Sequence, residues 1–171
     1  MTAVAARPRV YLAGFMGCGK TTLGRRLAEH RAVPFVDLDA AFESLAARTV
    51  RDAFETRGEA WFREREAELL RGTADIPGAV VALGGGTFVF PDNAAFVKRS
   101  GISVFLDVPF DVIAARLGDK AMDRPLFRSL EEARALYEAR LPSYRMADRI
   151  VSLSGDEPVE AAVGRIEEAL R

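Results

Sequence analysis

Apolar residues along this chain alternate between short continuous runs and longer stretches with helical spacing. The continuous runs predict buried strands at residues 9–13, 33–36, 80–83, 102–107 and 150–153. The helical spacing predicts helices near residues 20–32, 58–71, 92–99, 110–117, 130–146 and 157–170. Strands that alternate with helices in this way are typical of an α/β fold built on a parallel sheet.

Two regions interrupt the alternation of strands and helices. Residues 38–71 contain helical pieces but no strand, with a break at residues 56–58, which predicts a helical insertion on one side of the sheet. Residues 118–129 are polar and are punctuated by Gly118 and Pro125. Because a loop of that length in a compact domain is usually functional, we expect it to act as a lid.

The composition indicates how many domains to expect and argues against some kinds of binding partner. A chain of 171 residues with 49% hydrophobic residues can bury one substantial core, so we expect one domain. Lys and Arg total 24 against 25 Asp and Glu, so there is no basic excess for non-specific binding to nucleic acid or an acidic membrane. With one cysteine, no long apolar run and no signal-peptide pattern, we expect a soluble cytoplasmic protein.

The segment Gly14–Thr21 matches the phosphate-loop pattern G-x-x-x-x-G-K-T between a predicted strand and a predicted helix. Glycines let backbone N–H groups turn toward phosphate oxygens, and the start of the helix adds its positive end. Lys20 would bridge the β and γ phosphates, and the Thr21 hydroxyl would bind Mg²⁺. The expected ATP contacts here are Gly17, Cys18, Gly19, Lys20, Thr21 and Thr22. The structural alternative is a glycine-rich connecting loop.

The lysine of this motif stands out against the composition, because 21 of the 24 basic residues are Arg and only three are Lys. Cys18, the one cysteine, lies in the same loop. It is either a thiol activated by Lys20 and the helix start, whose alkylation would block nucleotide binding, or a small residue that fills the loop. We favour the small filler.

A phosphate loop alone is compatible with a GTPase, an ATPase motor or a small-molecule kinase. The sequence contains no Asn-Lys-x-Asp or Thr-Lys-x-Asp segment of the kind that reads guanine, so a GTPase is disfavoured. A chain of 171 residues leaves little room for elements that couple hydrolysis to mechanical work. A kinase for a small metabolite fits best.

Two further segments follow predicted strands. Asp37 and Asp39 come at the end of the second strand, the edge of the sheet where ligands bind. Strand alternation would put both carboxylates on one face, where one could support Mg²⁺ and the other could accept a proton from an attacking hydroxyl. The structural alternative is a helix cap. Gly84–Gly86 would let backbone N–H groups approach a substrate closely, unless they form only a loose turn.

Six segments together resemble the shikimate kinase family, over residues 9–170. They are GFMGCGKTTLG at 14–24, the Asp37-x-Asp39 pair, RGEAWFRERE at 57–66, GGG at 84–86, DRPL at 123–126 and RLPSY at 140–144. The resemblance implies a three-layer α/β/α phosphate-loop fold with a five-stranded parallel sheet, as a single domain over residues 1–171. It places the substrate-binding region at about 38–71 and the lid at about 117–129. The implied reaction phosphorylates the 3-hydroxyl of shikimate with ATP, in chorismate and aromatic amino-acid synthesis.

The resemblance also implies roles at the substrate. Asp39 resembles the residue that holds the shikimate hydroxyls and activates the one that is phosphorylated, while Arg63 and Arg140 resemble a clamp for the carboxylate. Planar guanidinium groups suit a carboxylate because they can bind both its oxygens. Without the resemblance, Arg63 could simply pair with Glu59 on a helix surface. The remaining substrate contacts implied are Gly84, Gly85, Gly86, Phe54 and Phe62.

At the nucleotide, Arg124 in the lid resembles the arginine that reaches the ATP phosphates, and Arg116 matches, more loosely, one near adenine. Asp37 resembles the carboxylate near Mg²⁺. The expected partners are ATP and shikimate, with no nucleic acid and no membrane, and we expect a monomer. Two alternatives stay open: a gluconate kinase with a similar phosphate loop, and a non-catalytic nucleotide-binding module.

Overall fold

A computed structural model describes residues 7–118 and 129–171 of the chain. Its centre is a five-stranded sheet in the order β2-β3-β1-β4-β5, in which every neighbouring pair is parallel. The strands are β1 (Arg9–Ala13), β2 (Phe35–Asp37), β3 (Val80–Ala82), β4 (Gly101–Asp107) and β5 (Arg149–Ser152). The α/β class and the five parallel strands are therefore confirmed.

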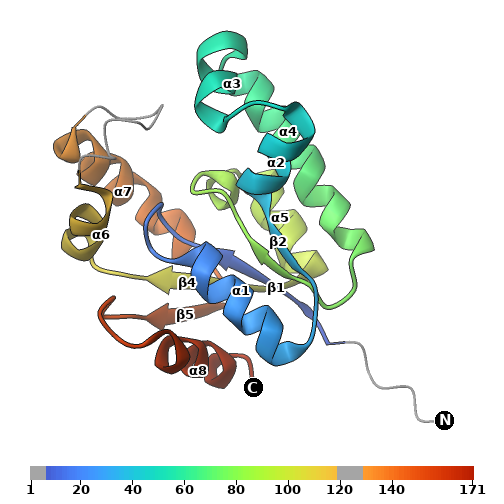
Figure 1. Ribbon diagram of the computed structural model, residues 1–171, viewed down its shortest axis with the longest axis vertical. Helices are drawn as coiled ribbons and strands as arrows, with labels where there is room; N and C mark the ends of the chain where they lie inside the picture. The colour runs from blue at the N-terminus through green and yellow to red at the C-terminus, as the bar shows by residue number, and fades with distance from the viewer. Residues whose placement is uncertain (1–6, 119–128) are drawn as a thin grey trace.

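Helices cover both faces of this sheet (Figure 1). The chain crosses the sheet in one direction from β1 to β2 and in the opposite direction from β3 to β4. Because connections between parallel strands are right-handed, the helices of these two connections lie on opposite faces of the sheet. Helices α1 and α8 pack together on one face, and α5 covers the other. The helices are α1 (Lys20–Arg31), α2 (Leu38–Ala46), α3 (Val50–Arg57), α4 (Glu59–Gly72), α5 (Pro91–Ser100), α6 (Phe110–Leu117), α7 (Leu130–Tyr144) and α8 (Val159–Ala169), with 3₁₀ turns η1 (Thr73–Asp75) and η2 (Thr87–Val89).

Two apolar clusters hold these layers together. The larger lies on both faces of the sheet, where central strand residues such as Leu12 and Val81 are fully buried. The smaller joins α2, α3 and α4 through Phe42, Ala53 and Phe62. These three helices stand together at the top of the view in Figure 1, above β2. The helical insertion expected at residues 38–71 is confirmed, and the break expected at residues 56–58 falls at Gly58, between α3 and α4.

Side-chain caps explain where several of these helices begin. The carboxylate of Asp37 accepts the Ala40 N–H at 3.1 Å and starts α2 directly at the end of β2. Thr49 caps α3 and Ser129 caps α7 in the same way, each at 3.1 Å. Such a cap satisfies backbone donors that have no partner inside the helix.

The second strand differs from its prediction, since it covers residues 35–37 instead of 33–36. Ala32 closes α1 in the left-handed conformation, and the Val33 N–H bonds back to the Ala28 carbonyl at 3.0 Å. Val33 therefore belongs to the end of the helix, and the strand starts later.

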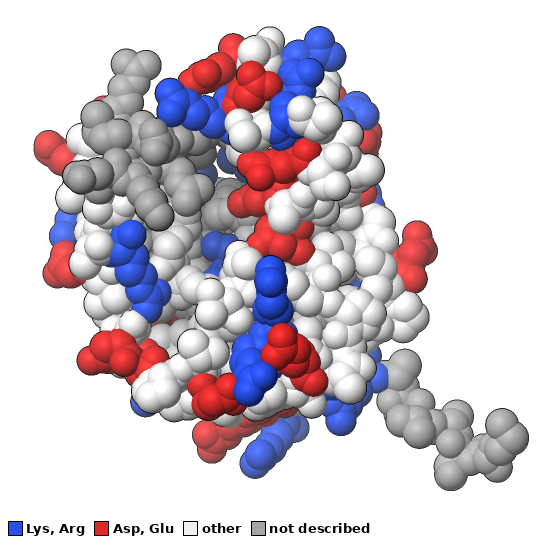
Figure 2. All heavy atoms as spheres, viewed as in Figure 1, with Lys and Arg blue, Asp and Glu red and all other residues white. Residues whose placement is uncertain are grey.

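Charged side chains of both signs are interspersed over the described part of the face shown in Figure 2. This distribution agrees with the absence of a basic excess in the composition. Within residues 7–118 and 129–171, no helix has the length and apolar character needed to cross a membrane.

Candidate active site

A cavity of about 460 Å³ opens at the carboxyl ends of the strands. The phosphate loop, the start of α2, the glycine segment after β3 and the loop after β5 line it. The expected residues among its lining are Gly17, Cys18, Gly19, Lys20, Thr21, Thr22, Asp37, Asp39, Gly85 and Arg116. Ligands in open α/β sheets bind at this edge, so the topology and the cavity agree.

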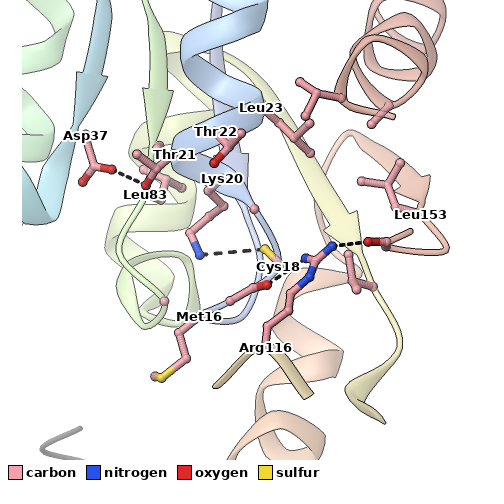
Figure 3. A pocket seen from close by; sticks show the side chains of 18 of the residues that line it. Met16, Cys18, Lys20, Thr21, Thr22, Leu23, Asp37, Leu83, Arg116 and Leu153 are labelled. Carbon is pink, nitrogen blue, oxygen red and sulfur yellow. Dashed lines mark hydrogen bonds between the residues drawn. The ribbon is translucent and has the colours of Figure 1, made fainter. Parts of the chain in front are cut away.

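The phosphate loop depends on glycine backbone geometry. Gly17 and Gly19 have φ angles of 78° and 103°, in the left-handed region that other residues rarely adopt. The Lys20 ammonium folds back over the loop and donates to the carbonyls of Gly14 at 2.8 Å and Phe15 at 3.0 Å. Its Nζ lies 3.9 Å from the Cys18 sulfur (Figure 3). The lysine is therefore already held against the loop that would surround a phosphate.

Cys18 is only 1% exposed and packs within the main apolar core. A Cβ added to Gly14 would come within 2.8 Å of its sulfur, so the loop backbone closes tightly around the thiol. Both facts favour a small filler over a thiol that reagents reach readily.

The two aspartates do not share a strand face, and that part of the prediction is wrong. Asp37 ends β2, but Asp39 lies in the first turn of α2, because Asp37 starts the helix at once. Both nevertheless line the cavity. Asp37 is the helix cap considered as the structural alternative: one carboxylate oxygen caps α2, and the other accepts the Thr21 hydroxyl at 2.5 Å (Figure 3). Its support of Mg²⁺ stays a prediction.

Polar side chains pack against the glycine segment, so closely at Gly84 and Gly86 that a Cβ there would collide with them. A Cβ on Gly84 would lie 2.9 Å from Asp39 Oδ1, and one on Gly86 would lie 2.6 Å from Arg63 Nη2. A Cβ on Gly85 would be 3.5 Å from Arg140 Nη1. The segment is therefore no loose turn: it brings together side chains from α2, α4 and α7.

Arg63 is held by two carboxylates and surrounded by aromatic rings. Its guanidinium lies 2.8 Å from Glu66 and 3.3 Å from Glu59, so the simple helix pair considered from the sequence does form. The side chain is only 13% exposed, because rings cover it. The ring centroids of Phe54, Phe62 and Phe90 lie 5.6, 5.2 and 5.2 Å from its central carbon, within the range of cation–π attraction. Phe54 and Phe62 thus pack around Arg63, outside the set of residues that lines the cavity.

Sequence reasoning missed Phe90 and Glu66. Glu66 is 2% exposed and accepts the Thr87 hydroxyl at 2.6 Å while it pairs with Arg63. A signal for it was present, since Phe62, Glu66 and Leu70 recur every four residues and all are buried. A carboxylate in the apolar stripe of a helix indicates a buried partner.

Arg140 is buried on α7 with one guanidinium nitrogen unused. The residue is 7% exposed, and its Nη1 has no hydrogen-bond partner among the described residues. Its central carbon lies 5.9 Å from the ring of Phe15 in the phosphate loop. A buried cationic N–H without an acceptor is unfavourable by itself, so this position is suited to an anionic oxygen from a ligand.

Arg116 connects the two sides of the nucleotide end of the cavity. Its Nη1 donates to the Gly17 carbonyl at 2.9 Å, and its Nη2 donates to the Gly155 carbonyl. Arg116 belongs to α6, and Figure 3 shows its side chain between the phosphate loop and the segment after Leu153. Arg124 and most of the lid expected at about 117–129 lie outside the described residues.

Comparison with known proteins shows which family this chain resembles in sequence and in fold. The family model for shikimate kinase matches residues 16–171. The chain is 39% identical to a shikimate kinase of Ruegeria pomeroyi over 171 residues, covering 98% of this chain and 87% of the relative. It is similar to a crystal structure of shikimate kinase from Bacteroides thetaiotaomicron, with TM-score 0.86, 37% identity and coverage of 95% and 98% of the two chains.

Two further solved structures bear on the alternatives. One is a shikimate kinase from Acinetobacter baumannii in complex with shikimate, with TM-score 0.87, 32% identity and coverage of 95% of this chain and 92% of that one. A gluconokinase from Sinorhizobium meliloti has TM-score 0.53 and 20% identity, with coverage of 95% and 91%, which is a likeness of fold alone. Because the family model matches residues 16–171 and a curated relative is 39% identical over 98% of this chain, the chain belongs to the shikimate kinase family.

Proposed function

We propose that this protein transfers the γ-phosphoryl group of ATP to the 3-hydroxyl of shikimate, giving shikimate 3-phosphate and ADP for chorismate and aromatic amino-acid synthesis. The observation that carries the proposal is the buried, unpartnered Nη1 of Arg140, which lies beside Gly85. Shikimate brings a carboxylate, and that group would supply the acceptor this nitrogen lacks.

The nucleotide half of the site is the phosphate loop. Backbone N–H groups of Gly17, Cys18 and Gly19 and the start of α1 would hold the phosphates of ATP, with Thr22 beside them. Lys20 would exchange its bonds to two loop carbonyls for the β and γ phosphates. Arg116, which bridges the phosphate loop and the loop after β5, would hold the adenine end of the cavity in shape.

Thr21 and Asp37 are the residues that would hold Mg²⁺. Their oxygens are 2.5 Å apart and line the cavity, and hard cations of this kind prefer oxygen ligands completed by phosphates and water. When bound, the ion would neutralise charge on the transferring phosphoryl group.

The substrate half is built on the glycine segment. Arg63 and Arg140 would bind the two oxygens of the carboxylate, and the backbone of Gly84–Gly86 would contact the ring. Phe54 and Phe62 form the apolar wall behind Arg63. Rings around a guanidinium exclude water from it, which strengthens its contact with a carboxylate.

Asp39 would accept the proton of the attacking hydroxyl, since it lies between the phosphate loop and the glycine segment. The rest of the chemistry is alignment and charge neutralisation, which Lys20 supplies from one side. Arg124 is assigned to the transferring group from the sequence resemblance alone. We expect the enzyme to act as a cytoplasmic monomer.

An ADP-release assay with ATP, Mg²⁺ and either shikimate or gluconate tests the proposal. We expect shikimate to be turned over at least about a hundredfold faster, because a site that pairs with specific polar groups rejects a substrate that places them differently. Lys20→Ala is the matched inactive control, and ³¹P NMR of the product identifies the phosphorylated hydroxyl. Faster release with gluconate would favour a gluconate kinase, and no release with either would favour a non-catalytic nucleotide-binding module.

A further inference from the structure

Tyr144 lies one helical turn beyond Arg140 on α7 and has no part in the functions assigned above. It is fully buried, and its ring stacks on Phe105 of β4 with centroids 5.2 Å apart and an angle of 26°. Its hydroxyl donates to the backbone carbonyl of Gly85. Burial raises the pKa of Tyr144 far above its usual value in spite of the neighbouring Arg140, so the hydroxyl stays protonated and remains a donor.

The middle glycine therefore lies against two side chains of one helix. Tyr144 holds the Gly85 carbonyl, and a Cβ on Gly85 would lie 3.5 Å from Arg140 Nη1. Because residues four apart on a helix share a face, Arg140 and Tyr144 present one face of α7 to the glycine segment. Gly86, the next residue, packs against Arg63. Both guanidinium groups therefore pack against the same short glycine segment.

Other hydrogen bonds of the segment do not tie it to α7. The Thr87 N–H bonds to Gly84 at 3.1 Å and the Val89 N–H bonds to Gly86 at 3.2 Å, and both are internal to the turn. The Gly85–Gly86 peptide bond is trans, so a fixed Gly85 carbonyl also fixes the Gly86 N–H on the opposite side of the peptide plane. Among the described residues, the Tyr144 hydroxyl is the hydrogen-bonding side chain of α7 that orients this peptide.

We propose that Tyr144 is a positioning residue for substrate binding: its hydroxyl holds the Gly85 carbonyl so that Arg63, Arg140 and the glycine backbone keep their positions relative to one another. This inference rests on the proposed function. Tyr144 touches neither the substrate nor the reacting atoms. Loss of its hydroxyl would keep both arginine side chains but release the Gly85 peptide and the contact between Tyr144 and Arg140, which weakens the binding of shikimate and leaves the ATP site unchanged.

The test compares Tyr144→Phe with Tyr137→Phe. Phenylalanine at position 144 keeps the stack on Phe105 and removes only the donor. Tyr137 is a second buried tyrosine of α7, and its hydroxyl donates to the Val108 carbonyl at 3.2 Å, away from the glycine segment. We expect Tyr144→Phe to raise the KM for shikimate about three- to tenfold, the effect of one hydrogen bond, with the KM for ATP unchanged. Tyr137→Phe should leave the KM for shikimate unchanged.

A second variant restores the donor. Tyr144→4-aminophenylalanine places an N–H where the hydroxyl was, and we expect it to bring the KM for shikimate back to about the wild-type value. If Tyr144→Phe does not fold, Tyr144→4-aminophenylalanine alone tests the inference. A raised KM for shikimate in that variant would then overturn it.

Three outcomes contradict the positioning role while the proposed function stands. They are an unchanged KM for shikimate in Tyr144→Phe, an equal rise in the KM for ATP, and the same rise in Tyr137→Phe. Wild-type protein in the same assay distinguishes failure of the positioning role from failure of the proposed function. If the wild type does not phosphorylate shikimate, the proposed function fails and the inference fails with it.

Discussion

Arg140→Met is expected to weaken shikimate binding without destabilising the free protein. Arg140 is 7% exposed, and its Nη1 has no partner among the described residues. An unsatisfied buried donor costs about 1–3 kcal/mol, and methionine, unbranched and apolar, can occupy the same channel without that cost. The substitution also removes the contact with the Phe15 ring, worth about 0.5–1 kcal/mol. The free energy of unfolding should therefore stay the same or rise by about 2 kcal/mol.

Whereas the stability of the free protein should stay the same or rise, its affinity for shikimate should fall strongly. A hydrogen bond between charged groups contributes about 1.5–3 kcal/mol, so the loss of one raises the dissociation constant of shikimate about 10- to 150-fold. Isothermal titration with shikimate measures the affinity, and denaturant unfolding without ligand measures the stability. A protein made more stable and less able to bind would show that the arginine is kept for its ligand.

Arg31→Met is the matched control. Arg31 also has a buried nitrogen without a partner, its Nε, but its Nη1 pairs with Glu167 at 3.3 Å across the contact between α1 and α8. Its removal leaves Glu167 without that partner, so we expect lower stability and unchanged affinity for shikimate. Our reasoning about Arg140 fails if Arg140→Met binds shikimate as the wild type does. It also fails if that variant loses more than about 2 kcal/mol of stability, since Nη1 would then be satisfied in the free protein.

Three other predictions concern separate parts of the molecule. Lys20→Ala should lower kcat by at least about a hundredfold while the circular dichroism spectrum stays the same; measurable turnover near the wild-type rate would exclude its role at the phosphates. Arg63→Lys should raise the KM for shikimate about tenfold, because the charge stays but the two-pronged contact is lost; unchanged affinity would remove Arg63 from carboxylate binding. Burial raises the pKa of Asp148, but hydrogen bonds from the Ser103 hydroxyl and N–H outweigh it and hold the pKa below its usual value. That stabilisation is present above the unfolded pKa, about 4, and is lost as the pH falls through the lower folded pKa. In denaturant titrations, Asp148→Asn should therefore make the free energy of unfolding depend less on pH on the acid side. An unchanged pH dependence would contradict this role of Asp148.

Much of the sheet and many helix positions could be predicted because local signals and tertiary packing agree. Helix α6 has the predicted bounds, since Pro109 before it and Gly118 after it mark both ends. The predicted secondary structure is wrong where two local sequence signals overlap. Asp37 ends a strand and caps a helix at the same time, and an argument from strand alternation does not anticipate that Asp39 is already helical.

The candidate site divides in a similar way. The phosphate loop is contiguous, so its residues could be identified from spacing. Arg63 and Arg140 required the family resemblance, since their spacing by itself also fits exposed helix positions. Phe90, which covers Arg63 from the end of η2, and Tyr144, which bonds to Gly85, act only through contacts between distant segments. No local pattern along the chain encodes those contacts.

The strand order β2-β3-β1-β4-β5 has a consequence for how ligands and folding are linked. The phosphate loop follows the central strand, whereas Asp39, Arg63 and Arg140 arrive from α2, α4 and α7. No single element and its adjoining loop contain all of these residues, so partly unfolded states that lose α2, α4 or α7 lack part of the binding site. Ligand binding therefore stabilises the whole molecule against subglobal opening. Saturating shikimate and nucleotide should slow amide hydrogen exchange in the buried strands far from the cavity as well as in the loops that touch it.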